Sequence, residues 1–282
     1  MAAVLREYRN KSVRAPHEVL KLGRKLLQTH SPGALGDDLW PLLEQTYLAA
    51  LDMGDTALAG ELFSQLDQRF PGSQRVEMLQ GVRLEADGEL DTARRLYEEI
   101  LQGEESNLII WKRLITVYKQ LNQVQKAIDS LTQLLDVFYN DLEGWLELAA
   151  LYTEIFQYDH ALQALSHALL LAPQNPFHAL QFAETAYTGG DIPLALSQFL
   201  RVTELVPSSS GQGVGLRAWL GVKQCIRRIQ YAPKKLESKS GAPGVERPGL
   251  VDECATERVL EAYDGEGVCV EGKKAVRRWL GA

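Results

Sequence analysis

The sequence has few cysteines, few histidines and no long apolar run, and each shortage excludes a class of protein. Three cysteines among 282 residues, all in the last third of the chain, suit neither a disulfide framework nor a paired-CxxC zinc site. They favour a reducing compartment. The longest apolar stretch, residues 161–172, is interrupted by Gln163, Ser166 and His167. We therefore predict no membrane-spanning helix.

The start of the chain and the net charge exclude further classes. The first residues are charged from Arg6 onward and lack the apolar centre of a secretory signal peptide, so we expect a cytosolic or nuclear protein. The 30 Lys and Arg against 37 Asp and Glu leave a formal net charge of −7. A net acidic chain is a poor candidate for binding nucleic acid, and we expect no nucleic-acid partner.

Motifs of catalysis are also missing. The sequence contains neither a phosphate-binding G-x-x-x-x-G-K-[ST] loop nor a G-x-S-x-G nucleophile turn. The spacing of seven residues would allow His160 and His167 to share a helix face, but no cysteine or acidic residue at ligand spacing completes a metal set. We expect no catalytic residue, no metal and no cofactor. An enzyme with an uncommon site around these two histidines remains an alternative, which metal analysis would test.

Two smaller features have structural interpretations. Asp37 and Asp38 precede the first repeat helix, where a carboxylate suits an N-cap better than a catalytic pair. Cys225 lies beside Arg227 and Arg228, which would favour a thiolate, yet a buried structural thiol is the preferred interpretation.

A repeat of 34 residues organises most of the chain. An alanine recurs at this spacing, and an aromatic residue or leucine follows each alanine by four positions. The alanines are Ala59, Ala93, Ala127, Ala161 and Ala195, and their followers are Phe63, Tyr97, Leu131, Leu165 and Phe199. This pattern resembles the tetratricopeptide repeat, in which a small residue sits where the two helices of a pair cross. Turns with residues that tolerate left-handed backbone separate the helices, at Gly54, Gly88, Asn122 and Gly190.

The predicted fold is all-α, a tetratricopeptide-repeat solenoid with an N-terminal helix and a C-terminal capping helix. Ile229 replaces the expected alanine, so we expect the array to end there. The predicted parts are a basic N-terminal helical segment (1–35), five repeats (36–209), the capping helix (210–231), and a linker with a short, partly helical tail (232–282). The N-terminal helix is expected from Pro16 to Gln28, ended by residues 31–33, and the tail helices over 250–263 and 273–280.

The first helices of such an array line a concave groove. Positions five, nine and twelve of each first helix are expected to face it. These are Glu44, Leu48, Leu51, Met78, Val82, Glu85, Lys112, Thr116, Lys119, Leu146, Ala150, Thr153, Leu180, Glu184 and Tyr187. The mixture of apolar and charged side chains suits a partner-binding groove for polypeptide. The alternative for each residue is that it packs against the neighbouring repeat.

Four segments carry a resemblance to a known family. They are residues 36–40 (GDDLW), 69–76 (RFPGSQRV), 145–152 and 187–190. Together they resemble the subunit 2 family of the endoplasmic reticulum membrane protein complex over about residues 17–207. The resemblance implies a non-catalytic scaffold, peripheral on the cytosolic face of the endoplasmic reticulum membrane. It also implies that the chain clasps cytosolic segments of membrane-embedded subunits, contacts a second soluble subunit, and supports insertion of transmembrane and tail-anchored proteins. Contact with the membrane is then indirect, through these partners.

A second function class stays open, a soluble adaptor or co-chaperone outside this complex. Tetratricopeptide co-chaperones hold the C-terminal carboxylate of heat-shock proteins with Lys at position five and Asn at position nine. No repeat has this pair, because Lys112 is followed by Thr116. We therefore expect no binding to chaperone C-terminal peptides, and a peptide array would test this.

The charge is unevenly distributed along the repeats. Residues 1–35 carry a net charge of +5, residues 36–209 carry −16, and residues 210–282 carry +4. An acidic array would attract the positively charged juxtamembrane segments that membrane proteins place on the cytosolic side. A solvated acidic surface without a partner is the alternative, and salt-sensitive binding would distinguish the two.

Overall fold

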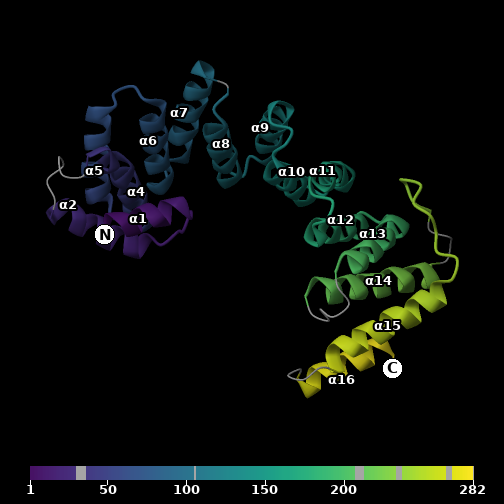
Figure 1. Cartoon of the computed structure of the whole chain (residues 1–282). Helices are drawn as coiled ribbons and strands as arrows, with labels where there is room; N and C mark the ends of the chain where they lie inside the picture. The colour runs from purple at the N-terminus through teal and green to yellow at the C-terminus, as the bar shows by residue number, and fades with distance from the viewer. Residues whose placement is uncertain (30–35, 105, 207–212, 233–236, 265–268, 282) are drawn as a thin grey trace. The chain divides into compact units, whose positions relative to one another are not determined.

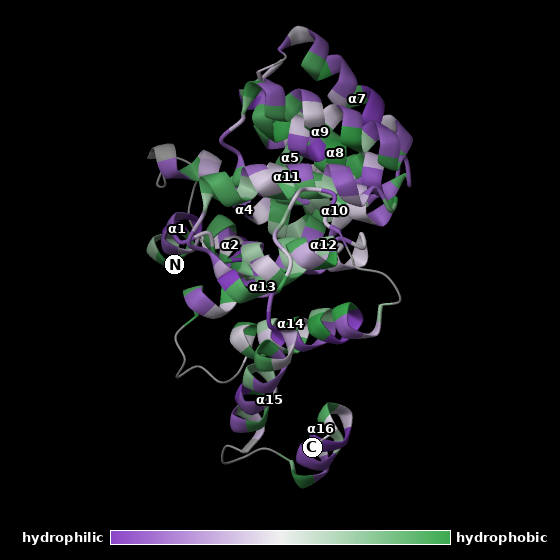
Figure 2. Cartoon of the chain, turned by 90° about the vertical axis from the view of Figure 1, so that its right-hand side faces the viewer, coloured by the Kyte–Doolittle hydropathy of each residue, from purple (hydrophilic) through white to green (hydrophobic). Residues whose placement is uncertain are grey.

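The computed structural model describes residues 1–29, 36–104, 106–206, 213–232, 237–264 and 269–281. All regular structure in these ranges is helical (Figure 1). The chain forms two compact units, Met1–Leu131 and Thr132–Ala282, and the division falls inside helix α9 (Val124–Val137). Hydrophobic and hydrophilic residues occur together on the helices, as expected where one side of each helix is packed (Figure 2).

The first unit is a row of helices in which each packs on the next. α2 contacts α4, and the contacts continue through α5, α6, α7 and α8, while α1 lies against α2 and α4. The bounds are α1 Ala2–Asn10, α2 Pro16–Thr29, η1 Gly36–Asp38, α4 Leu39–Asp52, α5 Thr56–Arg69, α6 Gln74–Ala86, α7 Leu90–Gly103 and α8 Leu108–Gln120. The predicted end of the N-terminal helix at residues 31–33 lies outside the described residues.

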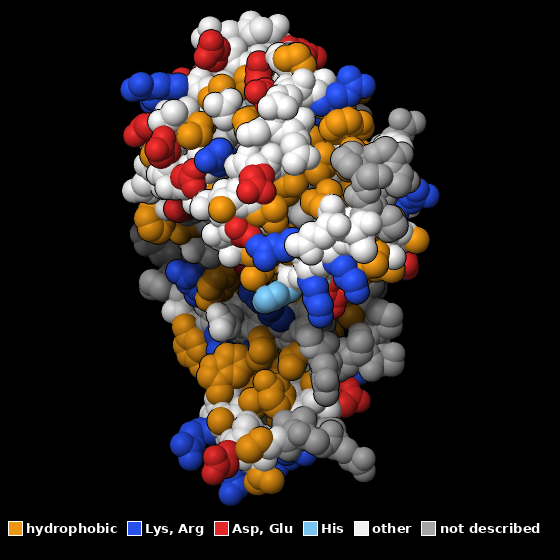
Figure 3. Space-filling view, turned by 90° about the vertical axis from the view of Figure 1, so that its left-hand side faces the viewer, with side chains coloured by type: hydrophobic (Ala, Val, Ile, Leu, Met, Phe, Trp, Pro, Cys, Tyr) orange, Lys and Arg blue, Asp and Glu red, His pale blue; other side chains and the backbone are white. Residues whose placement is uncertain are grey.

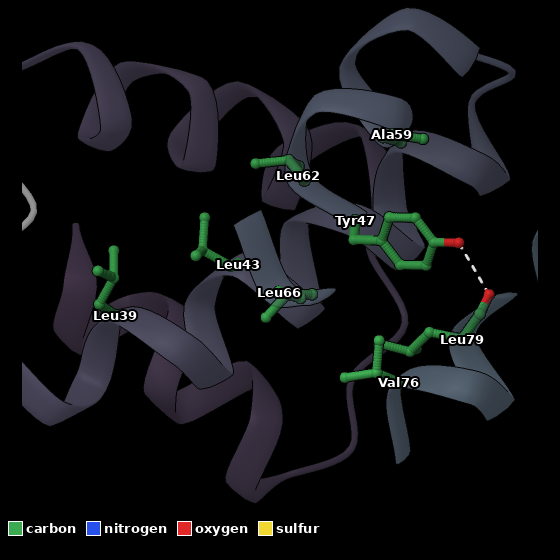
Figure 4. Close-up of a cluster of buried hydrophobic side chains, with 9 residues drawn as sticks. Leu39, Leu43, Tyr47, Ala59, Leu62, Leu66, Val76 and Leu79 are labelled. Atoms are coloured by element: carbon green, nitrogen blue, oxygen red, sulfur yellow. Dashed lines mark hydrogen bonds between the residues drawn. The ribbon is translucent and has the colours of Figure 1, made fainter. Parts of the chain in front are cut away.

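The core of this unit forms where α4, α5 and α6 meet (Figure 4). Tyr47 is fully buried there, and its hydroxyl donates a hydrogen bond to the Leu79 carbonyl oxygen at 2.8 Å. Ala59 is also fully buried, as are the other four alanines of the 34-residue ladder. The burial of all five alanines agrees with the steric reason for the repeat, because a larger side chain at these positions would push two helices apart.

Helix α1 is not among the predicted helices. It is held by Leu5, whose side chain is fully buried in a small cluster with Val19, Leu26 and residues of α4. Arg6 of α1 also forms an ion pair with Asp38. Asp38 occupies the predicted N-cap position of α4, but its side chain makes no cap hydrogen bond. The side chain of Asp37 lies outside the described part of the chain.

The second unit continues the same pattern. Each helix from α10 to α16 packs on the next, and α12 also contacts α14. The bounds are α10 Leu142–Glu154, α11 Tyr158–Leu171, α12 Pro176–Thr188, α13 Ile192–Leu205, α14 Val214–Tyr231, α15 Pro248–Asp264 and α16 Val270–Leu280. Helix α14 is longer than the repeat helices because Gln224 stands at the period position that holds Gly190 one repeat earlier, so no left-handed residue ends the helix.

Candidate partner-binding site

A pocket of about 560 Å³ opens in the first unit. Its wall combines side chains of α2, α4, α6 and α8 with the connection between α1 and α2. Four of the predicted groove residues lie in this wall, Leu48, Leu51, Val82 and Glu85. The remaining lining residues are Ser12, Val13, Arg14, Ala15, Pro16, Val19, Gln45, Ala49, Asp52, Ala86 and Arg113. The pocket is therefore mostly apolar, with a few charged groups among the lining side chains, which suits an anchoring side chain of a bound polypeptide.

Two carboxylates in the pocket wall, Asp52 and Glu85, each lie against an arginine of the same wall. Asp52 Oδ1 accepts a hydrogen bond from an Arg14 guanidinium nitrogen at 2.9 Å, and this bond raises the pKa of Arg14. Glu85 accepts a hydrogen bond from the Tyr97 hydroxyl at 2.5 Å, and its side chain is only 9% exposed. Arg113 lies 3.6 Å from the other Glu85 oxygen. A nearly buried carboxylate keeps its charge at low cost only when donors of this kind surround it.

The other predicted groove residues of the first unit do not line the pocket. Glu44 forms an ion pair with Arg75 at 2.8 Å, and Met78 packs against the core cluster of α4, α5 and α6. The remaining three lie on α8, where Lys112 and Thr116 are half-buried and Lys119 is exposed. Of the nine predicted groove positions in this unit, four therefore line the pocket and five do not.

The second unit has a smaller pocket of about 270 Å³ between α12, α13 and α14. The predicted residues Glu184 and Tyr187 lie in its wall with Arg217 and Leu220. Arg217 holds Glu184 through two contacts, of 2.5 and 2.9 Å, and the Arg228 guanidinium lies 5.2 Å from the centre of the Tyr187 ring. Figure 3 shares its vertical axis with Figure 2, and in its lower part hydrophobic side chains gather at the level where Figure 2 labels α14 and α15.

The other four predicted residues of this unit do not line its pocket. Leu146 and Thr153 are half-buried and Ala150 is exposed, whereas Leu180 is 5% exposed and belongs to the core. The Thr153 hydroxyl donates to the Ala149 carbonyl oxygen at 2.7 Å, within its own helix. The alternative of packing against neighbours therefore applies to Leu180.

Several pocket residues are absent from the predicted set, above all Arg14, Asp52, Arg113 and Arg217. Arg14 lies in a connection before α2, where helical periodicity carries no information. Arg217 follows Glu184 by 33 residues, one less than the period. A search for opposite charges near the repeat spacing would have found this pair.

The histidines and the cysteine have packing roles. The His167 ring stacks on Trp145 with centroids 4.3 Å apart, and the His160 ring stacks on Tyr152 at 5.2 Å. Among the described residues no group of three or more His, Cys, Asp or Glu side chains is placed to hold a metal ion. Cys225 is fully buried, which confirms a buried structural thiol, and this burial raises the pKa of the thiol to about 12. No helix in the described ranges is long and apolar enough to cross a bilayer.

Solved structures with the same architecture exist. A tetratricopeptide repeat protein from Parabacteroides merdae has a TM-score of 0.50 and 16% identity, over 86% of this chain and 99% of that one. YrrB, described as a TPR protein with an unusual peptide-binding site, also has a TM-score of 0.50, with 17% identity over 75% of this chain and 97% of its own. The stacked helix pairs, with a buried alanine at each crossing, define the chain as a tetratricopeptide-repeat protein.

Proteins of similar sequence show which family of tetratricopeptide-repeat proteins the chain belongs to. Residues 70–201 match the EMC2 TPR-like repeat domain family, and ER membrane protein complex subunit 2-B of Xenopus laevis is 36% identical over 233 residues, 82% of this chain and 76% of the relative. The chain belongs to the ER membrane protein complex subunit 2 family. Subunit 2-A of Xenopus laevis is 37% identical over 188 residues, which span 67% of this chain and 63% of that relative.

Proposed function

We propose that this chain is a non-catalytic scaffold subunit of the ER membrane protein complex. Its relatives in Xenopus and Dictyostelium carry the name of that complex. In this proposal the chain is peripheral on the cytosolic face of the endoplasmic reticulum and clasps cytosolic segments of membrane-embedded subunits. It thereby supports insertion and folding of transmembrane and tail-anchored proteins. A second soluble subunit is a further partner, and contact with the membrane runs through these partners.

The observation that carries the binding proposal is the pocket of the first unit. Leu48, Leu51 and Val82 offer apolar contact to an anchoring side chain, and two carboxylate–arginine pairs lie in the same wall. The repeats carry a net charge of −16, so the segments that fit best combine an apolar anchor with flanking Lys or Arg. Juxtamembrane segments on the cytosolic side have this composition.

A purification of the tagged full chain from cells in mild detergent tests the proposal. We expect integral membrane proteins to co-purify, as identified by mass spectrometry. Raising the salt from about 0.1 M to about 0.5 M should release part of them, because exposed charges are screened over shorter distances. A chain that runs free of membrane proteins in native extracts, or that binds chaperone C-terminal peptides, would favour the soluble adaptor instead.

A pair of substitutions tests the pocket. Val82→Glu places a charge in the pocket wall, and we expect it to reduce co-purification of the membrane partners. Ile109→Glu is the matched control, because Ile109 is 61% exposed and does not line the pocket. Both variants should melt within a few degrees of the parent. Equal recovery of partners with Val82→Glu and Ile109→Glu would remove the pocket from the proposal.

A further inference from the structure

Asp191 is a buried carboxylate with an unusual set of donors. It is 5% exposed and lies at the N-cap of α13, where Oδ1 accepts the Leu194 backbone N–H at 3.1 Å. The other oxygen, Oδ2, faces a segment that follows α14. It accepts the Ser238 hydroxyl at 2.8 Å and the Lys239 backbone N–H at 3.0 Å. The Ser240 backbone N–H and hydroxyl each lie 3.4 Å from the same oxygen, but they lie closer to the Ser238 hydroxyl oxygen, at 3.2 and 2.9 Å.

These contacts anchor a segment that the sequence predicts to be a linker. Residues 238–240 bind a carboxylate 47 to 49 residues earlier in the chain. Successive backbone N–H groups with hydroxyls around one anion form the same kind of concave site that binds phosphate and carboxylate ligands. Lys239 adds a longer contact to Asp159, at 3.4 Å, between two exposed side chains.

In the sequence, residues 238–240 lie between α14 and α15, and these two helices pack on each other. α15 packs on α14, where the buried Lys223 ammonium donates to Asp252 and to the Thr256 hydroxyl, both at 2.7 Å. Ala255 and Val259 of α15 are fully buried. Attachment of residues 238–240 to Asp191 therefore divides the connection from α14 to α15 into two shorter pieces.

We propose that Ser238 and Ser240 form a phosphorylation site that controls this attachment. Transfer of the γ-phosphoryl group of ATP to either hydroxyl forms an Oγ–P bond, releases ADP and passes the hydroxyl proton to the kinase base. The hydroxyl is then lost as a donor, and a group of about −1.5 to −2 charge faces the nearly buried Asp191 carboxylate. Residues 238–240 then leave Asp191. Lys234 and Lys235 precede Ser238 in the sequence, so a kinase that recognises basic residues before serine is the class expected.

Hydrogen–deuterium exchange on the full chain tests this proposal. With phosphoserine incorporated at position 238 or 240 during synthesis, the Lys239 and Ser240 amides should exchange at least about tenfold faster than in the unmodified chain. Asp191→Asn should have the same effect on the Lys239 amide, whose N–H donates to Asp191. Asparagine still caps α13 through its oxygen, but its amide group presents donors to the donors of residues 238–240.

The matched control is Lys239→Gln. It removes the exposed pair with Asp159 but keeps the backbone N–H that binds Asp191, so the same amides should stay protected. The Leu194 amide should stay protected in every variant, which shows that α13 is still capped. Unchanged exchange of the Lys239 and Ser240 amides in the phosphoserine chains would overturn the proposal. So would equal acceleration in Lys239→Gln and Asp191→Asn. Neither result depends on the partners of the chain.

Discussion

The ring of Tyr97 lies directly against the backbone of Gly81. A Cβ at residue 81 would come within 2.3 Å of a Tyr97 ring carbon, closer than side-chain atoms pack. The contact joins α6 to α7. The Tyr97 hydroxyl also donates a hydrogen bond to Glu85, one turn further along α6. The glycine of the repeat pattern is therefore required by a close approach between helices and not by a turn.

Gly81→Ala should lower the stability of the first unit. The added methyl group must push the Tyr97 ring away, and overpacking of this kind costs about 1–3 kcal/mol. We expect a lower melting temperature and a lower urea midpoint. Gly60→Ala is the control, because Gly60 is also helical but has no atom within 4 Å of the added Cβ. It should be neutral or stabilise the chain by up to about 1 kcal/mol. Equal melting temperatures for the two variants would contradict the close approach.

Phe156→Gly should stabilise the second unit. Phe156 has φ of 61° and stands at the repeat position that holds Gly54, Gly88, Asn122 and Gly190, all with positive φ. A left-handed conformation costs a residue with a Cβ about 1–2 kcal/mol, which exceeds the entropy cost of glycine. Because Phe156 is 77% exposed, little packing is lost. We expect a higher thermal midpoint, with Phe177→Gly, at an exposed helical position, as a control that lowers it.

The free energy of unfolding should fall as the pH rises from about 10 to about 12. Burial raises the pKa of Tyr47 to about 12, whereas an unfolded tyrosine ionises near pH 10. In this interval the unfolded chain has lost a proton that the folded chain keeps, so unfolding becomes more favourable with pH. Urea titrations across this range should show a smaller slope for Tyr47→Phe. Tyr231→Phe, at a side chain that is 83% exposed, serves as the control substitution.

The three thiols should react in a defined order. Backbone N–H groups of Gly272 and Glu271 lower the pKa of Cys269, which is exposed, so this thiol should be alkylated first at neutral pH. Cys254 is also exposed, and Cys225 is buried. Cys225 should react only when the second unit unfolds. Timed alkylation followed by peptide mass spectrometry measures the order, and early labelling of Cys225 would contradict its burial.

The sequence by itself determined the helix pairs of this protein. An alanine every 34 residues predicts each crossing, and glycine or asparagine predicts most of the left-handed turns. Both signals are local, because they depend on the volume of one side chain or the φ of one residue. The left-handed backbone at Phe156 could not be predicted from its residue type, because the repeat geometry imposes it.

Only the tertiary structure decided which distant side chains meet. Arg14 pairs with Asp52 in the pocket wall, Leu5 packs α1 on α2 and α4, and residues 238–240 bind Asp191 across 47 to 49 positions. Repeat periodicity cannot encode such contacts, since they join segments that lie outside the repeats to single positions within them. These contacts depend on the path of the segments outside the repeats over the packed helices. A carboxylate that is buried there must then be surrounded by hydrogen-bond donors.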